Sequence, residues 1–131
     1  MKLIFDTNRY TDFARGVPEV VNRFESADEL WLSIIVLGEL RGGFAVGSKR
    51  RENEEKFEKF LARPNVKLLR LDEATAEHYS IVYSLLHRHG TLIPTNDIWI
   101  AALALQHDLT LDTNDKHFRH VPGLKLVDAT P

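Results

Sequence analysis

Short segments made largely of apolar residues recur along this chain and alternate with longer segments of helical periodicity. The apolar segments are residues 3–5, 30–32, 66–71, 109–111 and 124–127. Strands that are apolar along their length, rather than at every second position, are typical of a parallel sheet covered on both faces. The alternation with helices therefore predicts a three-layer α/β domain, with a mostly parallel central sheet of about five strands flanked by helices.

Six segments between these strands carry helix signals. Two helices are expected to begin after Asp6 and at Pro18, and four more to span residues 34–44, 48–61, 73–89 and 94–107. Asp6-Thr7-Asn8 offers side chains that cap helix N-termini, and Pro18 suits the first turn of a helix. Gly90 suits the end of the helix predicted over residues 73–89.

Length and composition indicate one domain without a membrane segment. A chain of 131 residues, 44% of them apolar, fits a single domain over residues 1–131. The net charge of −2 neither predicts nor excludes a polyanionic partner, and the lack of cysteine excludes a disulfide framework. No run approaches the roughly 18 apolar residues of a membrane span, and the N-terminal apolar run is too short for a signal peptide. We therefore expect a cytoplasmic protein.

Four acidic residues stand beside the most apolar stretches, where an unpaired carboxylate is costly to bury. Asp6 and Asp115 follow predicted strands. Glu39 lies within the apolar segment 34–40, and Asp97 directly precedes the apolar segment 98–102. The carboxyl ends of parallel strands meet at one edge of a sheet, where ligands bind. Because a bound cation removes the cost of burying carboxylates, we interpret these acids as candidates for a shared metal site.

Each acid also has a simpler interpretation. Asp6 and Asp115 can cap helices, and Asp97 can complement the dipole of the helix it begins. Glu39 has mostly apolar neighbours on its helix, so its carboxylate needs a partner. Oxygen ligands alone select a hard ion such as Mg²⁺ or Mn²⁺. Two such ions can activate a water molecule and stabilise the leaving oxygen of a phosphodiester, which predicts hydrolysis without a covalent intermediate.

The histidines give no comparable signal. None of the six lies in the His-Glu-x-x-His spacing of zinc peptidases. We interpret His117 and His120 as surface residues rather than ligands.

Four short motifs surround the acids. They are Asp6-Thr7-Asn8, Gly38-Glu39-Leu40, Asn96-Asp97-Ile98-Trp99-Ile100-Ala101-Ala102, and Thr113-Asn114-Asp115-Lys116-His117-Phe118 followed by Val121-Pro122-Gly123-Leu124. In this order they resemble the PIN-domain ribonucleases, and most closely the VapC toxins of prokaryotic VapBC toxin–antitoxin modules. The match spans the whole chain, and four motifs at these separations in so short a chain are a strong signal. The family fold agrees with the fold predicted from periodicity.

The resemblance implies a Mg²⁺- or Mn²⁺-dependent endoribonuclease toxin that cleaves transfer or ribosomal RNA and is inhibited by a VapB-type antitoxin. The family's acid quartet maps to Asp6, Glu39, Asp97 and Asp115. The first three would bind the principal metal, and the fourth would help to hold it or a second ion. Asn8 and Thr113 match polar positions that support the metal site. Asp112 departs from the family pattern, and three roles are open to it: it assists the site, faces outward or competes with Asp115.

Two kinds of partner follow from these motifs besides the antitoxin. Relatives are usually homodimers, and the segments 34–37 and 98–100 carry more apolar surface than one small sheet face covers, so we expect a homodimer. RNA affinity is expected from basic groups, since phosphate contacts supply most sequence-independent binding. The candidates are Arg9, Arg15, Arg41, Lys49, Arg50, Arg51, Lys116 and Arg119. Arg9 ranks first because it directly follows the first motif.

Two alternative functions are open. A phosphoacceptor receiver domain also gathers acids at a sheet edge and binds Mg²⁺. Such domains carry adjacent acids after the first strand and a lysine after the fifth, whereas this chain has one acid, Asp6, and ends with Asp128-Ala129-Thr130. A non-catalytic PIN-like module that only binds RNA or protein would not need the complete quartet of acids.

Overall fold

A parallel sheet forms the centre of the molecule. The computed structural model describes residues 1–127, so the segment Asp128-Ala129-Thr130 lies outside the described residues. Four strands, β1 (Lys2–Phe5), β2 (Glu29–Ser33), β3 (Val66–Leu69) and β4 (Thr110–Asp112), occur in the order β3-β2-β1-β4. Every neighbouring pair is parallel, as predicted. Central β1 pairs Ile4 with Trp31 on one side and with Leu111 on the other.

The fifth predicted strand, residues 124–127, is reduced to a single bridge between Leu111 and Leu126. The Leu111 amide donates to the Lys125 carbonyl at 2.8 Å, and the Val127 amide donates to the Leu111 carbonyl at 2.9 Å. Because β4 is only three residues long, its outer edge supports one such pairing. The described chain therefore has four strands where the sequence predicts about five.

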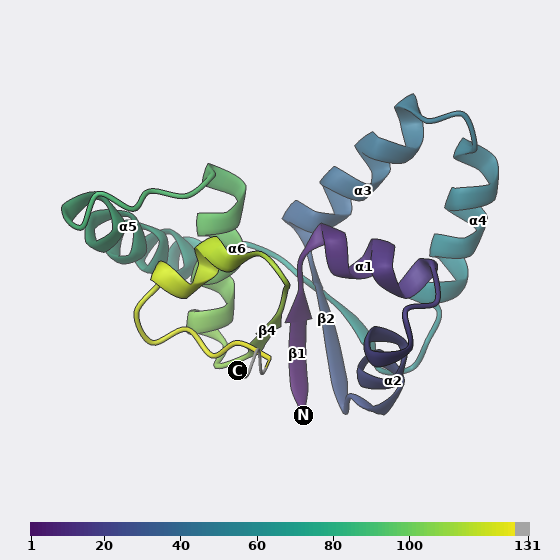
Figure 1. Ribbon diagram of the computed structural model, residues 1–131, viewed down its shortest axis with the longest axis horizontal. Helices are drawn as coiled ribbons and strands as arrows, with labels where there is room; N and C mark the ends of the chain where they lie inside the picture. Colours follow the sequence, from purple (N-terminus) through teal and green to yellow (C-terminus); the bar gives the residue numbers. More distant parts are fainter. Residues whose placement is uncertain (128–131) are drawn as a thin grey trace.

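Helices cover both faces of the sheet. They are α1 (Thr7–Ala14), α2 (Pro18–Ser26), α3 (Ile34–Val46), α4 (Arg50–Leu61), α5 (Glu73–Arg88), α6 (Thr95–Gln106) and the 3₁₀ helix η1 (Lys116–His120). In Figure 1, α5 and α6 lie on one side of the strands, and α1, α2 and α4 lie on the other. The predicted three-layer α/β architecture is confirmed. Within residues 1–127, no helix combines the length and the apolar character that crossing a membrane requires.

Caps place three helix starts directly at the carboxyl edge of the sheet. Asp6 follows β1 and accepts the Arg9 amide at 3.1 Å, which begins α1. Ser33 ends β2 and accepts the Val36 amide at 3.1 Å, which begins α3. Asp115 accepts the His117 amide at 3.3 Å, which begins η1. Each cap satisfies an amide that the first helical turn leaves unpaired, so the chain turns from strand to helix at this edge.

An aromatic cluster holds α1, α2 and α4 against β1. The ring centroid of Phe5 lies 5.0 Å from that of Phe24 and 5.8 Å from that of Phe60. Tyr10 on α1 lies 5.0 Å from Phe60 and 5.2 Å from Phe57. Full burial of each phenylalanine contributes about 1.5–3 kcal/mol. This packing fixes α1, and with it the capping residue Asp6.

The apolar surface available for a dimer differs from the sequence prediction at Ile98 and Ile100, whereas Ile34, Ile35 and Leu37 of the other predicted segment are partly exposed. Ile98 and Ile100 are 1% and 0% exposed, because α6 packs between the sheet and α5 and the protein's own core covers them. Exposed apolar side chains lie instead on α5 and in the loop after it, where Ile81, Tyr83 and Leu92 are 57%, 42% and 49% exposed.

Candidate metal centre

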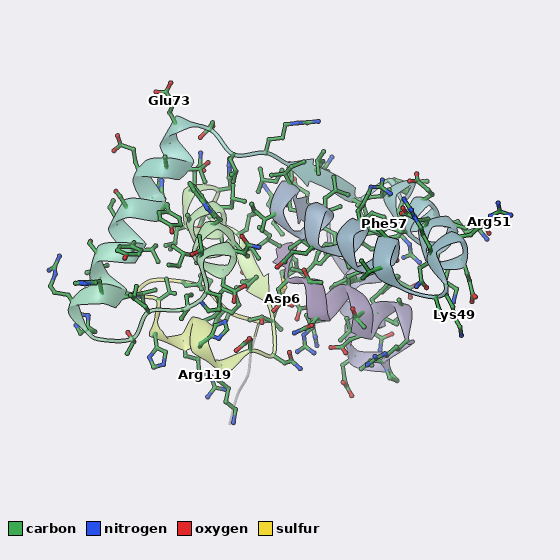
Figure 2. All side chains as sticks on the ribbon, turned by 90° about the horizontal axis from the view of Figure 1, so that it is seen from above. Asp6, Lys49, Arg51, Phe57, Glu73 and Arg119 are labelled. Carbon is green, nitrogen blue, oxygen red and sulfur yellow. The ribbon has the colours of Figure 1, made fainter. Side chains whose placement is uncertain are left out.

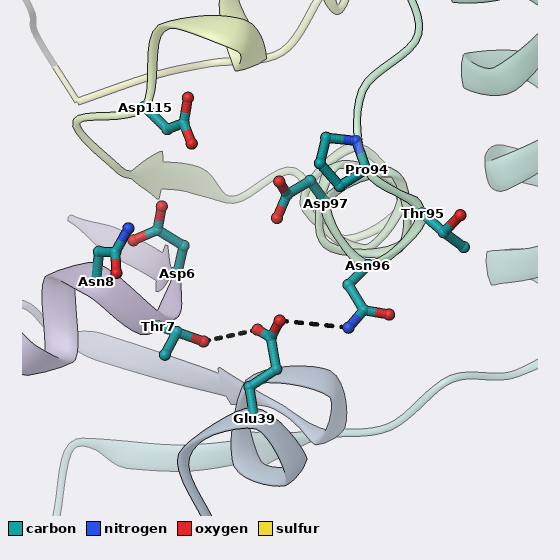
Figure 3. Close-up of a pocket in the computed structure, with 9 residues that line it drawn as sticks. All are labelled: Asp6, Thr7, Asn8, Glu39, Pro94, Thr95, Asn96, Asp97 and Asp115. Atoms are coloured by element: carbon teal, nitrogen blue, oxygen red, sulfur yellow. Dashed lines mark hydrogen bonds between the residues drawn. The ribbon is translucent and has the colours of Figure 1, made fainter. Parts of the chain in front are cut away.

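The four predicted acids meet around one cavity at the carboxyl edge of the sheet. The cavity has a volume of about 600 Å³ and is lined by Asp6, Thr7, Asn8, Glu39, Pro94, Thr95, Asn96, Asp97 and Asp115. Figure 3 shows the acids approaching it from the end of β1, from α3, from the first turn of α6 and from the loop after β4. Within residues 1–127, no lysine or arginine lines this cavity, so its lining groups carry only negative charge.

Asp6 is the most buried of the four acids, at 6% exposed. One of its oxygens, Oδ1, caps α1, and the other, Oδ2, accepts the hydroxyl of Thr113. The same hydroxyl oxygen of Thr113 accepts the Asp115 amide at 3.0 Å. Thr113 therefore links the carboxylate at the end of β1 to the backbone of the loop that carries Asp115.

Glu39 is exposed rather than buried, and two polar side chains supply the partners that its carboxylate requires. The Thr7 hydroxyl donates to its Oε1 at 2.7 Å, and the Asn96 amide donates to its Oε2 at 3.3 Å (Figure 3). Thr7 and Asn96 stand inside motifs that the sequence singles out, but no role was predicted for either side chain. Their hydrogen bonds hold the Glu39 carboxylate in the lining of the cavity.

His117, which the sequence predicts to be a surface residue rather than a ligand, is partly buried and contacts two of the acids. Its Nε2 lies 2.8 Å from Oδ2 of Asp97, and its Nδ1 lies 3.0 Å from Oδ1 of Asp115. The side chain is 28% exposed, whereas His120 in the same short helix is exposed as predicted. The sequence signal that could have identified His117 is its position two residues after a capping acid, within the first turn of η1.

Burial and crowding make the acid cluster electrostatically unfavourable by itself. Burial raises the pKa of the Asp6 carboxyl above its usual value; the Thr113 hydrogen bond opposes this, and the negative charge of Asp97 adds to it. Burial also raises the pKa of Asp97, where His117 opposes the shift and the charges of Glu39 and Asp115 increase it. Both raised pKa values indicate carboxylates that lack sufficient positive charge nearby.

The donor set fits a divalent cation. Carboxylate and hydroxyl oxygens from separate segments face one cavity, and such oxygens are the ligands that Mg²⁺ and Mn²⁺ prefer. Among the described residues, Asp97, Asp115 and His117 offer ligand atoms that all lie within 4.8 Å of one another. A cation would offset the burial, and the repulsion between acids, that raise the two pKa values.

The predicted supporting residues occupy different places. Asn8 lines the cavity, and Thr113 joins its walls. Asp112 does not line the cavity: its carboxylate is fully buried, 3.0 Å from Nε of Arg9 and 2.8 Å from Nε of Arg23. It neither faces outward nor competes with Asp115, but joins α1 and α2 to the end of β4.

Seven of the eight predicted basic residues fall into three groups, and Arg41 lies in none of them. Lys116 and Arg119 are exposed on η1 and, with Arg9, line a smaller cavity of about 160 Å³ on the other side of Asp115. Arg15 and Lys49 line a groove between α1, α3 and α4. Arg50 and Arg51 are exposed at the start of α4, and Figure 2 shows Lys49 and Arg51 at the end of the molecule far from Asp6. The structure therefore brings only part of the predicted basic set to the acids.

Two of these basic side chains are engaged within the fold. Arg9, ranked first from the sequence, pairs with Asp112 and, through Nη1, with Asp12 at 3.1 Å. Arg41 pairs with Glu54 at 2.7 Å and with Glu58 at 3.2 Å, which ties α3 to α4. The position of Arg9 and Arg41 next to motifs does not predict these ion-pair partners, because the partners lie on other elements or on the next helical turn.

Comparison with known proteins gives the family. Residues 3–124 match the sequence profile of the PIN domain. The chain belongs to the PIN-domain family. This PIN domain is 26% identical to Ribonuclease VapC4 of Mycobacterium tuberculosis over 94% of the chain and 83% of that protein. It is 34% identical to Toxin FitB of Neisseria gonorrhoeae over 86% of the chain and 87% of that protein.

A solved relative has the same fold. In the crystal structure of VapBC2 from Rickettsia felis bound to a DNA fragment from its promoter, one chain superposes on this PIN domain with a TM-score of 0.86. The two chains are 26% identical, and the match covers 97% of this chain and 98% of that one. The resemblance to PIN domains of the VapC type is thus confirmed, and a receiver-type domain is no longer an alternative.

Proposed function

We propose that this PIN domain, taken as a single unit over residues 1–131, is the endoribonuclease toxin of a type II toxin–antitoxin module and acts in the cytoplasm. It would hydrolyse RNA phosphodiesters with a divalent cation. The observation that carries this proposal is the convergence of four carboxylates on one cavity without a lining lysine or arginine. The names of its relatives, a VapC ribonuclease and the toxin FitB, support the reaction and the biological role.

The proposed roles of the acids follow from the family resemblance, and the proposed roles of the supporting residues follow from their contacts. Asp6, Glu39 and Asp97 would hold the principal Mg²⁺ or Mn²⁺, and Asp115 would help to hold it or a second ion. When bound, the cation supplies Lewis-acid activation and charge neutralisation for phosphodiester hydrolysis. Thr113 keeps Asp6 and the Asp115 loop together, and Thr7 and Asn96 orient Glu39; these three residues are proposed to position the ligands.

RNA binding is proposed for the basic side of Asp115. Lys116 and Arg119 have no ion-pair partner among residues 1–127, and with Arg9 they line the cavity next to the acid cluster. Positive groups there can contact RNA phosphates on one side of the bond that is cleaved.

An antitoxin segment is proposed to occupy the groove between α1, α3 and α4. This groove has a volume of about 600 Å³, and Tyr10, Leu40 and Phe44 contribute apolar surface to it. Thr7 and Glu39 line both the groove and the acid cavity, so the two are continuous. An apolar segment could fill the groove while an arginine pairs with carboxylates in the cavity. The solved complexes of VapB with VapC relatives support such a partner.

The reaction can be tested with purified protein and labelled RNA. We expect cleavage with Mn²⁺ or Mg²⁺, no cleavage with EDTA, and no cleavage by the Asp97→Asn variant. A wild-type protein that binds RNA but never cleaves it under these conditions would support the alternative, a non-catalytic PIN-like binding module. Mapping of the cut ends on total cellular RNA would then identify the target among transfer and ribosomal RNAs.

The toxin role can be tested by expression in a bacterial host. Expression of this chain alone should arrest growth, and co-expression of its neighbouring antitoxin should relieve the arrest. Relief should weaken when the arginine that enters the acid cavity is changed to alanine. Normal growth with the lone, folded protein would contradict the toxin role in that host.

A homodimer is also proposed. The exposed apolar side chains of α5 and its following loop, rather than Ile98 and Ile100, are the surface that a second copy would cover. Light scattering should give about twice the 15.0 kDa mass of the monomer. A monomer mass at high protein concentration would contradict this proposal.

A further inference from the structure

His117 is placed as a ligand would be, although it is not one of the acids. It lies in the first turn of η1, and its own backbone amide and its ring Nδ1 both contact Oδ1 of Asp115, at 3.3 Å and 3.0 Å. The carboxylate that caps the helix therefore also orients the ring. A carboxylate that holds one nitrogen of a histidine, and so directs the other nitrogen at a metal, is a common arrangement in metal sites.

The second ring nitrogen points at the acid cluster. Nε2 lies 2.8 Å from Oδ2 of Asp97, which itself lines the acid cavity. A neutral imidazole carries one N–H, so it can donate to Asp115 or to Asp97 but not to both. The Nε2 contact with Asp97 has hydrogen-bond geometry, so in the protein without metal Nε2–H donates to the Asp97 carboxylate. A cation that replaces this proton would be bound by both Nε2 and the Asp97 oxygen, because metal binding to a histidine releases the proton on the ligating nitrogen.

The spacing agrees with two adjacent ligand positions. At metal–ligand distances of about 2.1 Å, neighbouring corners of an octahedral site are about 3.0 Å apart. The Nε2 to Oδ2 distance of 2.8 Å is close to this value. The ligand atoms offered by Asp97, Asp115 and His117 also lie within 4.8 Å of one another.

We propose that Nε2 of His117 is a nitrogen ligand of the cation centre, and that it makes the position shared with Asp97 and Asp115 selective for a transition-metal ion such as Mn²⁺ over Mg²⁺. The proposal rests on the proposed function, because it takes the acid cluster to be a cation centre. Mg²⁺ is bound almost entirely by oxygen, whereas imidazole suits transition metals. An all-acid centre would lack this preference.

The test is pulsed electron paramagnetic resonance of this chain loaded with Mn²⁺. A directly bound imidazole gives the Mn²⁺ signal a modulation from ¹⁴N, and the modulation changes when the protein is labelled with ¹⁵N-histidine. We expect this nitrogen coupling in the wild type and its loss in His117→Gln. The Kd for Mn²⁺ should rise about tenfold or more in that variant, with a much smaller change for Mg²⁺.

His120→Gln is the matched control, because His120 is an exposed histidine in the same short helix. It should keep the nitrogen coupling and the wild-type Kd. The ¹⁵N-labelled wild type needs no variant, so the inference is testable even if His117→Gln folds poorly. Bound Mn²⁺ with only oxygen ligands in the wild type would overturn the role of His117 and leave the proposed function standing. Absence of any Mn²⁺ or Mg²⁺ binding would overturn both.

Discussion

At the scale of single residues, the carboxylate of Asp6 serves the fold and the candidate site together. Its Oδ1 caps α1, its Oδ2 accepts from Thr113, and the group still lines the acid cavity. Helix capping and metal binding, which are alternative interpretations of the sequence, are therefore compatible at this residue. Burying the Asp6 carboxylate beside the other acids is unfavourable without a cation, because burial and the charge of Asp97 both raise the pKa of Asp6.

This cost predicts how stability depends on pH in the protein without metal. A carboxyl with a raised folded-state pKa binds more protons in the folded state than in the unfolded state, so the free energy of unfolding falls as pH rises from the usual value of 3.8 through the raised value. Asp6→Asn should therefore unfold at higher urea concentration than the wild type at pH 7 in EDTA. The advantage should shrink toward pH 4.

Glu77→Gln is the control for this experiment, because it makes the same charge change on the exposed surface of α5. It should leave the pH dependence of the wild type unchanged. Equal pH dependence in Asp6→Asn and the wild type would contradict the electrostatic account of the cluster. The Asp6→Asn variant should be folded but unable to cleave RNA.

At the scale of secondary-structure elements, Asp112 joins α1 and α2 to the end of β4. Its buried carboxylate pairs with Arg9 from α1 and with Arg23 from α2. Arg23 contributes two hydrogen bonds, from Nε at 2.8 Å and from Nη2 at 3.2 Å. The ion pairs keep the helix capped by Asp6 next to the strand that leads to Asp115, so Asp112 is expected to act on the site only through the fold.

Asp112→Asn should lower the free energy of unfolding by about 3 kcal/mol, because removing one partner of a buried ion pair leaves charge uncompensated. Urea unfolding measures this loss. Asp12→Asn removes a partly exposed partner of the same Arg9 and should cost less than about 1 kcal/mol. RNA cleavage per folded molecule should persist in both variants, and complete loss of cleavage by folded Asp112→Asn would show that this carboxylate has a direct role.

The basic residues of η1 and those at the start of α4 are expected to differ in their contribution to RNA binding. The double variant Lys116→Ala/Arg119→Ala changes η1 beside the acid cluster, and Arg50→Ala/Arg51→Ala makes the same charge change at the distant start of α4. In EDTA, only the first should markedly weaken binding of single-stranded RNA. Two lost phosphate contacts should also reduce the slope of log K against log salt by about 1.4. Equal weakening by both variants would contradict a local RNA surface at η1.

At the scale of the whole molecule, the acids come together only because four separate parts of the chain end at one edge of the sheet. The end of β1, the helix α3, the first turn of α6 and the loop after β4 each contribute one carboxylate. A cation bound there would link segments that the unfolded chain keeps apart, so binding and folding are expected to be coupled.

This coupling predicts that metal stabilises the fold. Mg²⁺ or Mn²⁺ at a hundredfold excess over Kd should raise the free energy of unfolding by about 2.7 kcal/mol. A thermal-shift titration measures the gain, and Asp6→Asn and Asp97→Asn should lose most of it. An equal shift in the wild type and both variants would locate the ion elsewhere in the molecule.

Much of the fold was predictable because its signals are local. The apolar segments gave all four strands of the described sheet, and residues such as Pro18 and Gly90 gave helix ends close to those observed. The helix predicted over residues 34–44 continues through Gly42 and Gly43 to Val46, and Gly47 caps its end. The fifth strand shrank to one bridge because its partner, β4, is short.

By itself, the sequence determined the parallel α/β fold, because strands and helix caps depend on neighbouring residues. It also determined the meeting of the four acids, because all parallel strands end at the same edge of the sheet. Only the tertiary structure decided which other groups join or avoid that edge. His117 reaches Asp97 across 20 positions of the chain, and Asp112 meets Arg9 across 103. Such contacts depend on how helices pack across the sheet. They cannot be predicted from the residues that neighbour a side chain in the sequence.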